Sequence, residues 1–312
     1  MSLTSHLKDS KSPIKKFLEE QFPNTRTVTG ECAALLRDVG TIRPIDNVPY
    51  STLGIALDYR LRYYFSVTPF RDLVAWHGAK RISNEPIWDD VEAGSYAIGA
   101  GPNDPTLPME TIESFSTALT RSFSDCSPLG SNLVATKKRN WLVSVLYLHY
   151  SKRFTAPDRA TVLHFFSRGD DTTADDLLDI AQNHWVDDFC ALSQMFYDVF
   201  ESRLLNQAIL NPIFDGSRDV GRADADFILD SCLIEVKSTI NPRVTKTWLH
   251  QILGYVLLDY SDQYRLHDVG LYLSWQGKFI EWSLDDLIER LMGQKAPPLE
   301  KMRQDFRELA IL

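Results

Sequence analysis

The pattern of apolar and polar positions is clearest in the C-terminal half of the chain. Apolar residues recur there at helical spacing and predict a helix that ends near residue 205. After a turn-rich connector over residues 211–221, two β-type runs at 223–229 and 233–239 flank the dipeptide Asp230-Ser231. Two strands separated by so short a turn predict a β-hairpin. The apolar positions that define the helix are Trp185, Phe189, Leu192, Phe196 and Val199.

The pattern continues after the hairpin with a helix, two strands and another helix. The last helix is expected to begin with a capping box formed by Ser283 and Asp286. The order of helix, two strands, helix, two strands and helix predicts an α/β or α+β fold, with one mixed sheet against flanking helices. The expected segments are a helix over 247–258, strands over 269–275 and 279–282, a turn at Gln276-Gly277 and a helix to about Met292.

The N-terminal half predicts helices separated by long loops. Helices are expected over residues 53–65 and 141–154, whereas segment 76–108 is rich in Gly, Pro, Asn and Asp and predicts a loop. We therefore expect a helix-rich N-terminal region over residues 1–165 and an α/β core over residues 166–312.

Composition restricts the class of protein. The 312 residues are 44% hydrophobic and 24% charged, which is typical of a soluble globular protein. No apolar run is long enough to span a bilayer, and the N-terminus lacks the apolar segment of a secretory signal, so we expect a cytoplasmic protein without a membrane role. The net charge of −9 has the wrong sign for bulk attraction to nucleic acid, so any contact with phosphate has to be local.

The four cysteines are scattered along the chain without a CxxC pair. This spacing argues against a zinc ribbon, an iron–sulfur cluster and a disulfide framework. We expect buried free thiols at Cys32, Cys126, Cys190 and Cys232.

The predicted hairpin carries charged residues at matching positions. A two-residue turn places Asp226 opposite Glu235 and Asp224 opposite Lys237. Because side chains alternate along a strand, these four residues are expected on one face of the hairpin. The opposite face is expected to belong to the core and carries Phe227, Leu229, Ile234 and Val236.

Three carboxylates this close together repel one another unless a cation lies between them, and Mg²⁺ or Mn²⁺ prefers oxygen ligands. Such an ion lowers the pKa of a bound water, and a neighbouring ammonium can stabilise the charge that develops on phosphorus. The set therefore suits hydrolysis of a phosphodiester. The spacing D-x8-E-x-K also fits a surface hairpin that pairs opposite charges in solvent, which is the alternative interpretation.

The text GRADADFILDSCLIEVKST, residues 221–239, resembles the PD-(D/E)xK nucleases. The text QILGY, residues 251–255, resembles the Q-x3-Y element of their RecB-like and Cas4-like branch, although the Cas4 cysteine cluster is absent. The chain also resembles a group of bacterial proteins that share the ADAD and QxLGY text. The resemblance covers about a hundred residues, from the helix before Asn211 to the helix after Trp282, and implies a restriction-endonuclease-like core there.

The resemblance also implies roles for individual residues. Lys237 would position the attacking water, and Gln251 and Tyr255 would contact the substrate or brace Lys237. The acidic residue that many relatives supply from the preceding helix is not assigned, and Glu201 is the nearest candidate. The groups implied to bind Mg²⁺ or Mn²⁺ are Asp226, Glu235 and the backbone carbonyl of Val236, with Asp224 as a further candidate ligand.

These features together predict a metal-dependent nuclease. The expected substrate is DNA, and the resemblance implies DNA processing or defence against foreign DNA, including phage defence. Two alternatives are a non-catalytic module that binds nucleic acid or protein on a nuclease fold, and a hydrolase that acts on RNA or nucleotides. The sequence is compatible with a homodimer.

Overall fold

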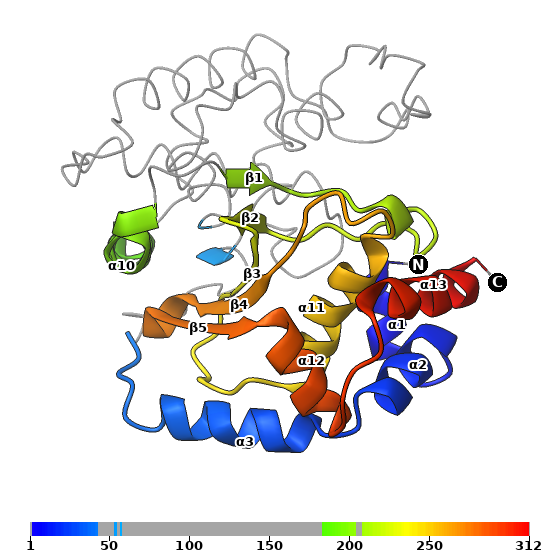
Figure 1. Ribbon diagram of the computed structural model, residues 1–312. Coiled ribbons are helices and arrows are strands. Elements are labelled where there is room, and N and C mark those ends of the chain that lie inside the picture. The colour runs from blue at the N-terminus through cyan, green and yellow to red at the C-terminus, as the bar shows by residue number, and fades with distance from the viewer. Residues whose placement is uncertain (1, 43–52, 55–56, 58–182, 204–207, 312) are drawn as a thin grey trace, which may run out of the picture. The chain divides into compact units, whose positions relative to one another are not determined.

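The computed structural model describes residues 2–42, 53–54, 57, 183–203 and 208–311 (Figure 1). The chain divides into two compact units, one formed by residues 1–43 with 195–312 and the other by residues 44–194. The boundary expected near residue 165 and the loop expected over 76–108 lie outside the described residues. The helices expected over 53–65 and 141–154 lie outside them too, except that Leu53, Gly54 and Leu57 are helical.

The first unit is built on a five-stranded mixed sheet in which the strands follow one another in chain order, β1-β2-β3-β4-β5. The central strands β3 and β4 run parallel, and every other neighbouring pair is antiparallel. The predicted mixed sheet with flanking helices is therefore confirmed. The strands are β1 (Ala208–Leu210), β2 (Phe227–Leu229), β3 (Cys232–Lys237), β4 (Asp268–Leu273) and β5 (Lys278–Ser283).

The predicted hairpin between β2 and β3 is confirmed, including its turn. Asp230 and Ser231 have φ values of 53° and 64°, the left-handed conformation that a two-residue type I′ turn requires at both positions. The register pairs Phe227 with Ile234, and its continuation places Asp226 opposite Glu235 as predicted. The strand does not continue as far back as expected, because β2 begins only at Phe227.

Helix α11 (Lys246–Leu258) connects β3 to β4 and lies at the centre of the helical layer (Figure 1). Its N-cap is Thr245, whose side chain accepts a hydrogen bond from the Trp248 backbone N–H at 3.3 Å. Every residue from 249 to 258 is buried. The helices that pack around α11 are α1 (Leu3–Lys8), α2 (Pro13–Gln21), α3 (Thr25–Leu36) and α13 (Leu299–Ala310).

The opposite face of the sheet packs against aromatic residues that follow Met195. These residues belong to helix α10 (Asn183–Phe200), which is followed by the 3₁₀ turn η4 (Glu201–Arg203). The helix predicted in this region is therefore confirmed. The ring centroids of Phe196 and Phe200 lie 5.3 and 5.4 Å from that of Tyr272 on β4. Both faces of the sheet are therefore covered.

Several features differ from the sequence-based expectation. Strand β1 and helix α13 were not predicted, and neither was the packing of α1, α2 and α3 against α11. Helix α12 (Leu284–Met292) begins after Ser283, but the Ser283 side chain makes no capping hydrogen bond, so the predicted capping box is wrong. Short 3₁₀ turns, η5 (Asp215–Ser217) and η6 (Ser274–Gln276), interrupt the connections.

The expectation of buried free thiols is confirmed for Cys32 and Cys232 and is wrong for Cys190, which is half-buried. Cys126 lies outside the described residues. Within the described segments, no helix has the length and apolar character needed to cross a membrane.

Candidate active site

Glu235 and Lys237 lie at the C-terminal end of β3, on the sheet face that α11 covers. Alternation along β3 places them on the same side as the fully buried Leu233, and both contact Gln251 of α11. The expectation that the charged face of the hairpin lies opposite the core is therefore wrong. Glu235 and Lys237 are instead enclosed between the sheet and a helix.

Four of the predicted site residues form one hydrogen-bonded network. The Lys237 ammonium donates to Glu235 Oε1 at 2.7 Å and to Gln251 Oε1 at 2.8 Å. The Gln251 amide in turn donates to Glu235 Oε1 at 3.0 Å and to the Tyr255 hydroxyl oxygen at 2.8 Å. Gln251 thus bridges the ammonium, the carboxylate and the phenol, and it holds the lysine in one orientation.

The second carboxylate oxygen of Glu235 is different. Glu235 is only 5% exposed, yet its Oε2 has no hydrogen-bond partner among the described residues. A buried charged oxygen without a partner is costly, and it calls for a water or an ion at that position. Since Oε1 already accepts from Lys237 and Gln251, Oε2 is the atom of this carboxylate that fits a metal ion.

Asp226 immediately precedes β2, at the position that the hairpin register places opposite Glu235. Its Oδ2 accepts a hydrogen bond from the Val236 backbone N–H at 2.6 Å, and this bond fixes the carboxylate against β3. In an extended strand the N–H and C=O groups of one residue point to the same side, so the Val236 carbonyl also faces Asp226. The Asp226 and Glu235 carboxylates and the Val236 carbonyl are the oxygen groups here that could hold Mg²⁺ or Mn²⁺.

The further acidic candidates are less closely associated with this set. Asp224 is exposed, and its backbone pairs with Ile213 in an isolated bridge. Glu201 is exposed in η4 and accepts a hydrogen bond from the Tyr197 hydroxyl at 3.1 Å. Among the residues that the structure describes, no three His, Cys, Asp or Glu side chains converge as a metal-binding group. The roles of Asp224 and Glu201 as ligands stay predictions.

The surroundings of the network favour a neutral Tyr255. Burial, and then the negative charge of Glu235, raises the pKa of Tyr255 far above its ordinary value, so its phenol stays protonated. The Lys237 ammonium lies 5.7 Å from the centroid of the Trp248 ring, close enough for a cation–π contact. Trp248 was not among the predicted site residues. Its spacing of three before Gln251 on a helix was the signal that places it on the same face.

The chain that follows Lys237 is held in place by η6. The Trp275 indole N–H donates to the Ser238 hydroxyl at 3.1 Å, and the Gln276 amide donates to the Thr239 carbonyl at 3.1 Å. Nothing in the local sequence pattern indicated these contacts, because they join segments nearly forty positions apart. They fix the point at which β3 leaves the sheet, and with it the position of Lys237.

Comparison with known proteins does not identify a family. No family model matches the chain, and no match was found among curated proteins or among solved structures.

Proposed function

We propose that this chain is a Mg²⁺- or Mn²⁺-dependent nuclease of the PD-(D/E)xK type that hydrolyses phosphodiester bonds in DNA. The observation that carries the proposal is the enclosed Lys237–Glu235–Gln251 network, in which one Glu235 oxygen is left without a partner. The strand order and the central βαβ connection through α11 support a restriction-endonuclease-like core of the RecB-like and Cas4-like branch. The assignment to DNA rests on the resemblance of the motif text.

Asp226, Glu235 and the Val236 carbonyl would hold the metal ion. When bound, the ion would polarise a phosphoryl oxygen and lower the pKa of a coordinated water. Lys237 would place its ammonium beside the attacking water and the charge that develops on phosphorus. Gln251 would keep that ammonium aligned, since its amide oxygen accepts one of the lysine protons.

The proposal is tested first by metal binding. A ligand that binds only the folded state raises the melting temperature, so Mn²⁺ is expected to stabilise the wild-type protein. Asp226→Asn is expected to lose most of this shift. Asp230→Asn removes one carboxylate from the exposed turn of the same hairpin, and as the matched control it is expected to keep the shift. An equal shift in wild type and Asp226→Asn would contradict the metal site.

The proposal is tested second by cleavage. The full chain is incubated with single-stranded and double-stranded DNA and RNA in Mg²⁺ or Mn²⁺, and the products are separated by length. We expect cleavage of DNA that is absent from Asp226→Asn and retained by Asp230→Asn. Cleavage of RNA alone would place the protein among ribonucleases. Binding of DNA without cleavage by the wild type in either metal would identify a binding module instead.

A further inference from the structure

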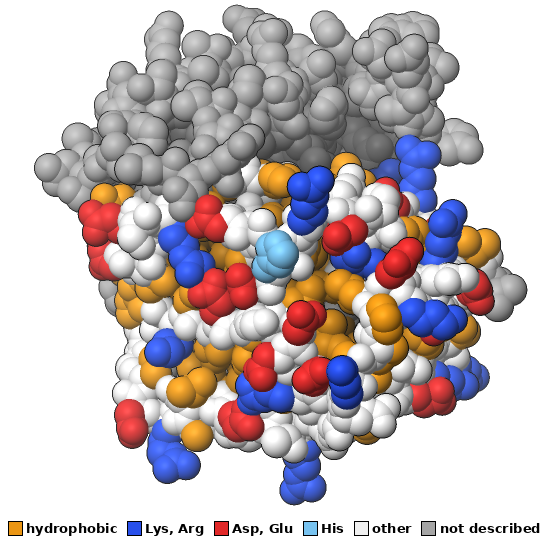
Figure 2. Space-filling view, in the orientation of Figure 1, with side chains coloured by type: hydrophobic (Ala, Val, Ile, Leu, Met, Phe, Trp, Pro, Cys, Tyr) orange, Lys and Arg blue, Asp and Glu red, His pale blue; other side chains and the backbone are white. Residues whose placement is uncertain are grey.

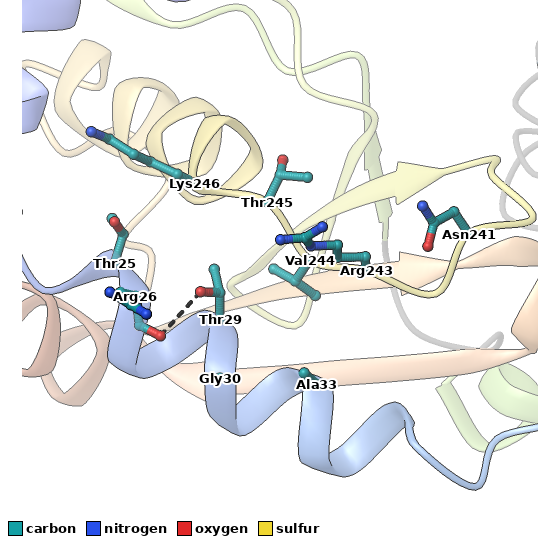
Figure 3. A pocket seen from close by; sticks show the side chains of 10 residues that line it. All are labelled: Thr25, Arg26, Thr29, Gly30, Ala33, Asn241, Arg243, Val244, Thr245 and Lys246. Carbon is teal, nitrogen blue, oxygen red and sulfur yellow. Dashed lines mark hydrogen bonds between the residues drawn. The ribbon is translucent and has the colours of Figure 1, made fainter.

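A pocket of about 710 Å³ lies between α3 and the loop that joins β3 to α11 (Figure 3). One wall is formed by the exposed face of α3 and the other by residues 241–246, which lead into the first turn of α11. The proposed active site does not use this pocket. The residues that line it are Thr25, Arg26, Thr29, Gly30, Ala33, Asn241, Arg243, Val244, Thr245 and Lys246.

The charged residues that line the pocket are all positive. Arg26 and Arg243 are exposed, and neither guanidinium has a hydrogen-bond or ion-pair partner among the described residues. Lys246 pairs with the half-buried Glu19 at 2.7 Å, and no Asp or Glu lines the pocket. The N-terminus of α11 adds a partial positive charge at the same place. Two unpaired guanidinium groups on opposite walls suit an anion with several acceptor oxygens, as a phosphate has.

The wall formed by α3 leaves room for a ligand. Gly30 and Ala33 carry little or no side chain, and a Cβ atom added at Gly30 would meet no heavy atom within 4 Å. Thr29 turns its hydroxyl toward its own helix, where it donates to the Arg26 carbonyl at 3.1 Å (Figure 3). The open space is therefore a property of the side chains that α3 presents.

The pocket is close to the candidate active site along α11. Trp248 contacts the Lys237 ammonium with its ring, and its backbone N–H donates to the side chain of Thr245, which lines the pocket. Lys246 and Gln251 are five positions apart on the helix, or roughly 7.5 Å along its axis. The pocket and the candidate active site thus share the first two turns of one helix.

We propose that this pocket binds a backbone phosphate of the polynucleotide substrate, away from the bond that is cleaved. The inference rests on the proposed nuclease function and names where the substrate strand is held. The face shown in Figure 2 has Lys and Arg interspersed with Asp and Glu over its described part, which fits attraction at a local site rather than over a broad surface. Arg26 and Arg243 bind the phosphate with their guanidinium groups. Lys246 and the N-terminus of α11 add further positive charge.

The first test removes the two guanidinium groups. Affinity for fluorescent DNA and RNA oligonucleotides is measured in Ca²⁺ at several salt concentrations, which separates binding from turnover. In the double variant Arg26→Gln/Arg243→Gln, affinity at ~0.1 M salt should fall about 10- to 100-fold, and the salt dependence should decrease by about two counterions. The matched control, Arg218→Gln/Arg265→Gln, removes two exposed arginines outside the pocket and is expected to bind as the wild type does.

The second test fills the pocket and leaves its arginines in place. Gly30→Glu introduces a carboxylate into the open space, whereas Gly30→Gln introduces a neutral side chain of the same size. Both replace a helical glycine, so neither should lower the melting temperature. Gly30→Glu is expected to bind at least about tenfold more weakly than Gly30→Gln.

The outcomes separate this inference from the proposed function. Wild-type affinity and salt dependence in both the double arginine variant and Gly30→Glu would overturn the phosphate site, and so would a wild type that binds no oligonucleotide. Binding that depends on the pocket, in a protein that never cleaves, would support the phosphate site and contradict the nuclease. Melting temperatures with and without Mn²⁺ show that each variant is folded and keeps its metal response.

Discussion

Helix α11 contacts a buried ion pair near each of its ends, and the two ion pairs differ in how completely they are satisfied. Beyond the C-terminal end, both oxygens of Asp259 have partners, since they accept from the backbone N–H groups of Gln263 and Tyr264 and from Arg303 at 3.4 Å. Burial raises the pKa of Asp259, and Arg303 opposes this shift. Nearer the N-terminal end, one oxygen of Glu235 is left open.

The difference teaches how a structural ion pair can be told from a functional one. Arg303 also donates to the Val256 carbonyl at 3.2 Å and to Asp262 at 2.8 Å, so it ties α13 to α11 with little capacity left for a ligand. In the Glu235 network the partners are concentrated on one oxygen, and the other is buried and available. An incompletely satisfied buried charge costs stability, which is reasonable where a ligand completes it.

The largest effect is expected at the structural pair. Arg303→Met leaves Asp259 buried without its counter-charge and should lower the free energy of unfolding by about 3–5 kcal/mol, measured by urea denaturation. Adding Asp259→Asn should recover part of the loss, because a neutral amide needs no counter-charge. Below its melting temperature the single variant is expected to cleave DNA at the wild-type rate, and a large loss of turnover in a folded protein would break the comparison.

The next effect is expected at Lys237. Lys237→Ala should reduce turnover by about a hundredfold or more, or about 2.7 kcal/mol, because the ammonium acts on charge that develops in the transition state. Affinity for DNA in Ca²⁺ should change far less. The measurement compares single-turnover rates in saturating Mg²⁺ with affinities in Ca²⁺. Equal losses in rate and affinity would assign Lys237 to substrate binding alone.

His250 tests whether an unpartnered buried atom is enough to mark a functional site. Its ring is 2% exposed, its Nε2 has no partner among the described residues, and burial lowers its pKa to about 4. Lys246 and Lys15 also lower this pKa, while Glu19 and the hydrogen bond to the Phe22 backbone raise it.

The sign of the pH effect follows from this lowered pKa. Between pH 6.5 and 4 the unfolded chain takes up a proton at His250 more readily than the folded protein does. The stability that the neutral ring contributes is therefore complete above pH 6.5 and lost as the pH falls, by about 2 kcal/mol at pH 5. His250→Gln should remove this part of the acid sensitivity, seen in urea denaturation at pH 7 and pH 5, and leave cleavage at pH 7 unchanged. Lost cleavage would place His250 in the site.

The smallest effect is expected at Gln251. Gln251→Ala removes the amide that aligns Lys237 and should reduce cleavage about tenfold while the Mn²⁺-induced rise in melting temperature is kept. Tyr255→Phe deletes only the hydroxyl at the edge of the network and serves as the control, with cleavage close to that of the wild type. If both variants cleave normally, the Q-x3-Y element has a structural role only.

The sequence predicted part of the local geometry of the candidate site. The turn at Asp230 and Ser231 determines the hairpin register, and the register alone brings Asp226 opposite Glu235. Helical spacing was enough to place Gln251 and Tyr255 on one face of α11. These features depend on residues close together in the chain, where alternation and helical periodicity carry the information.

The contacts between distant segments could not be predicted in the same way. The helix that covers Glu235 is determined by the path of the chain after β3. Local sequence patterns carry no information about that path. Strand β1 has only three residues and carries too little pattern to be recognised. Helix α13 follows two prolines, and its buried residues Met302, Arg303 and Phe306 recur at helical spacing. Because Arg303 is charged, this spacing did not stand out as an apolar pattern.

The packing of α1 on α11 has a consequence for how the protein is made. Leu3 packs against Gly254, where an added Cβ would lie 2.9 Å from its side chain, and the Leu3 N–H donates to the Arg222 carbonyl at 3.3 Å. A ribosome adds about 5–20 residues per second, so α1 would wait on the order of 10–50 s for its partner to be synthesised. Until then the core that buries Leu18 and Phe22 is incomplete, because α11 and α13 have not been synthesised. The nascent N-terminal segment therefore exposes apolar side chains of the kind that chaperones bind.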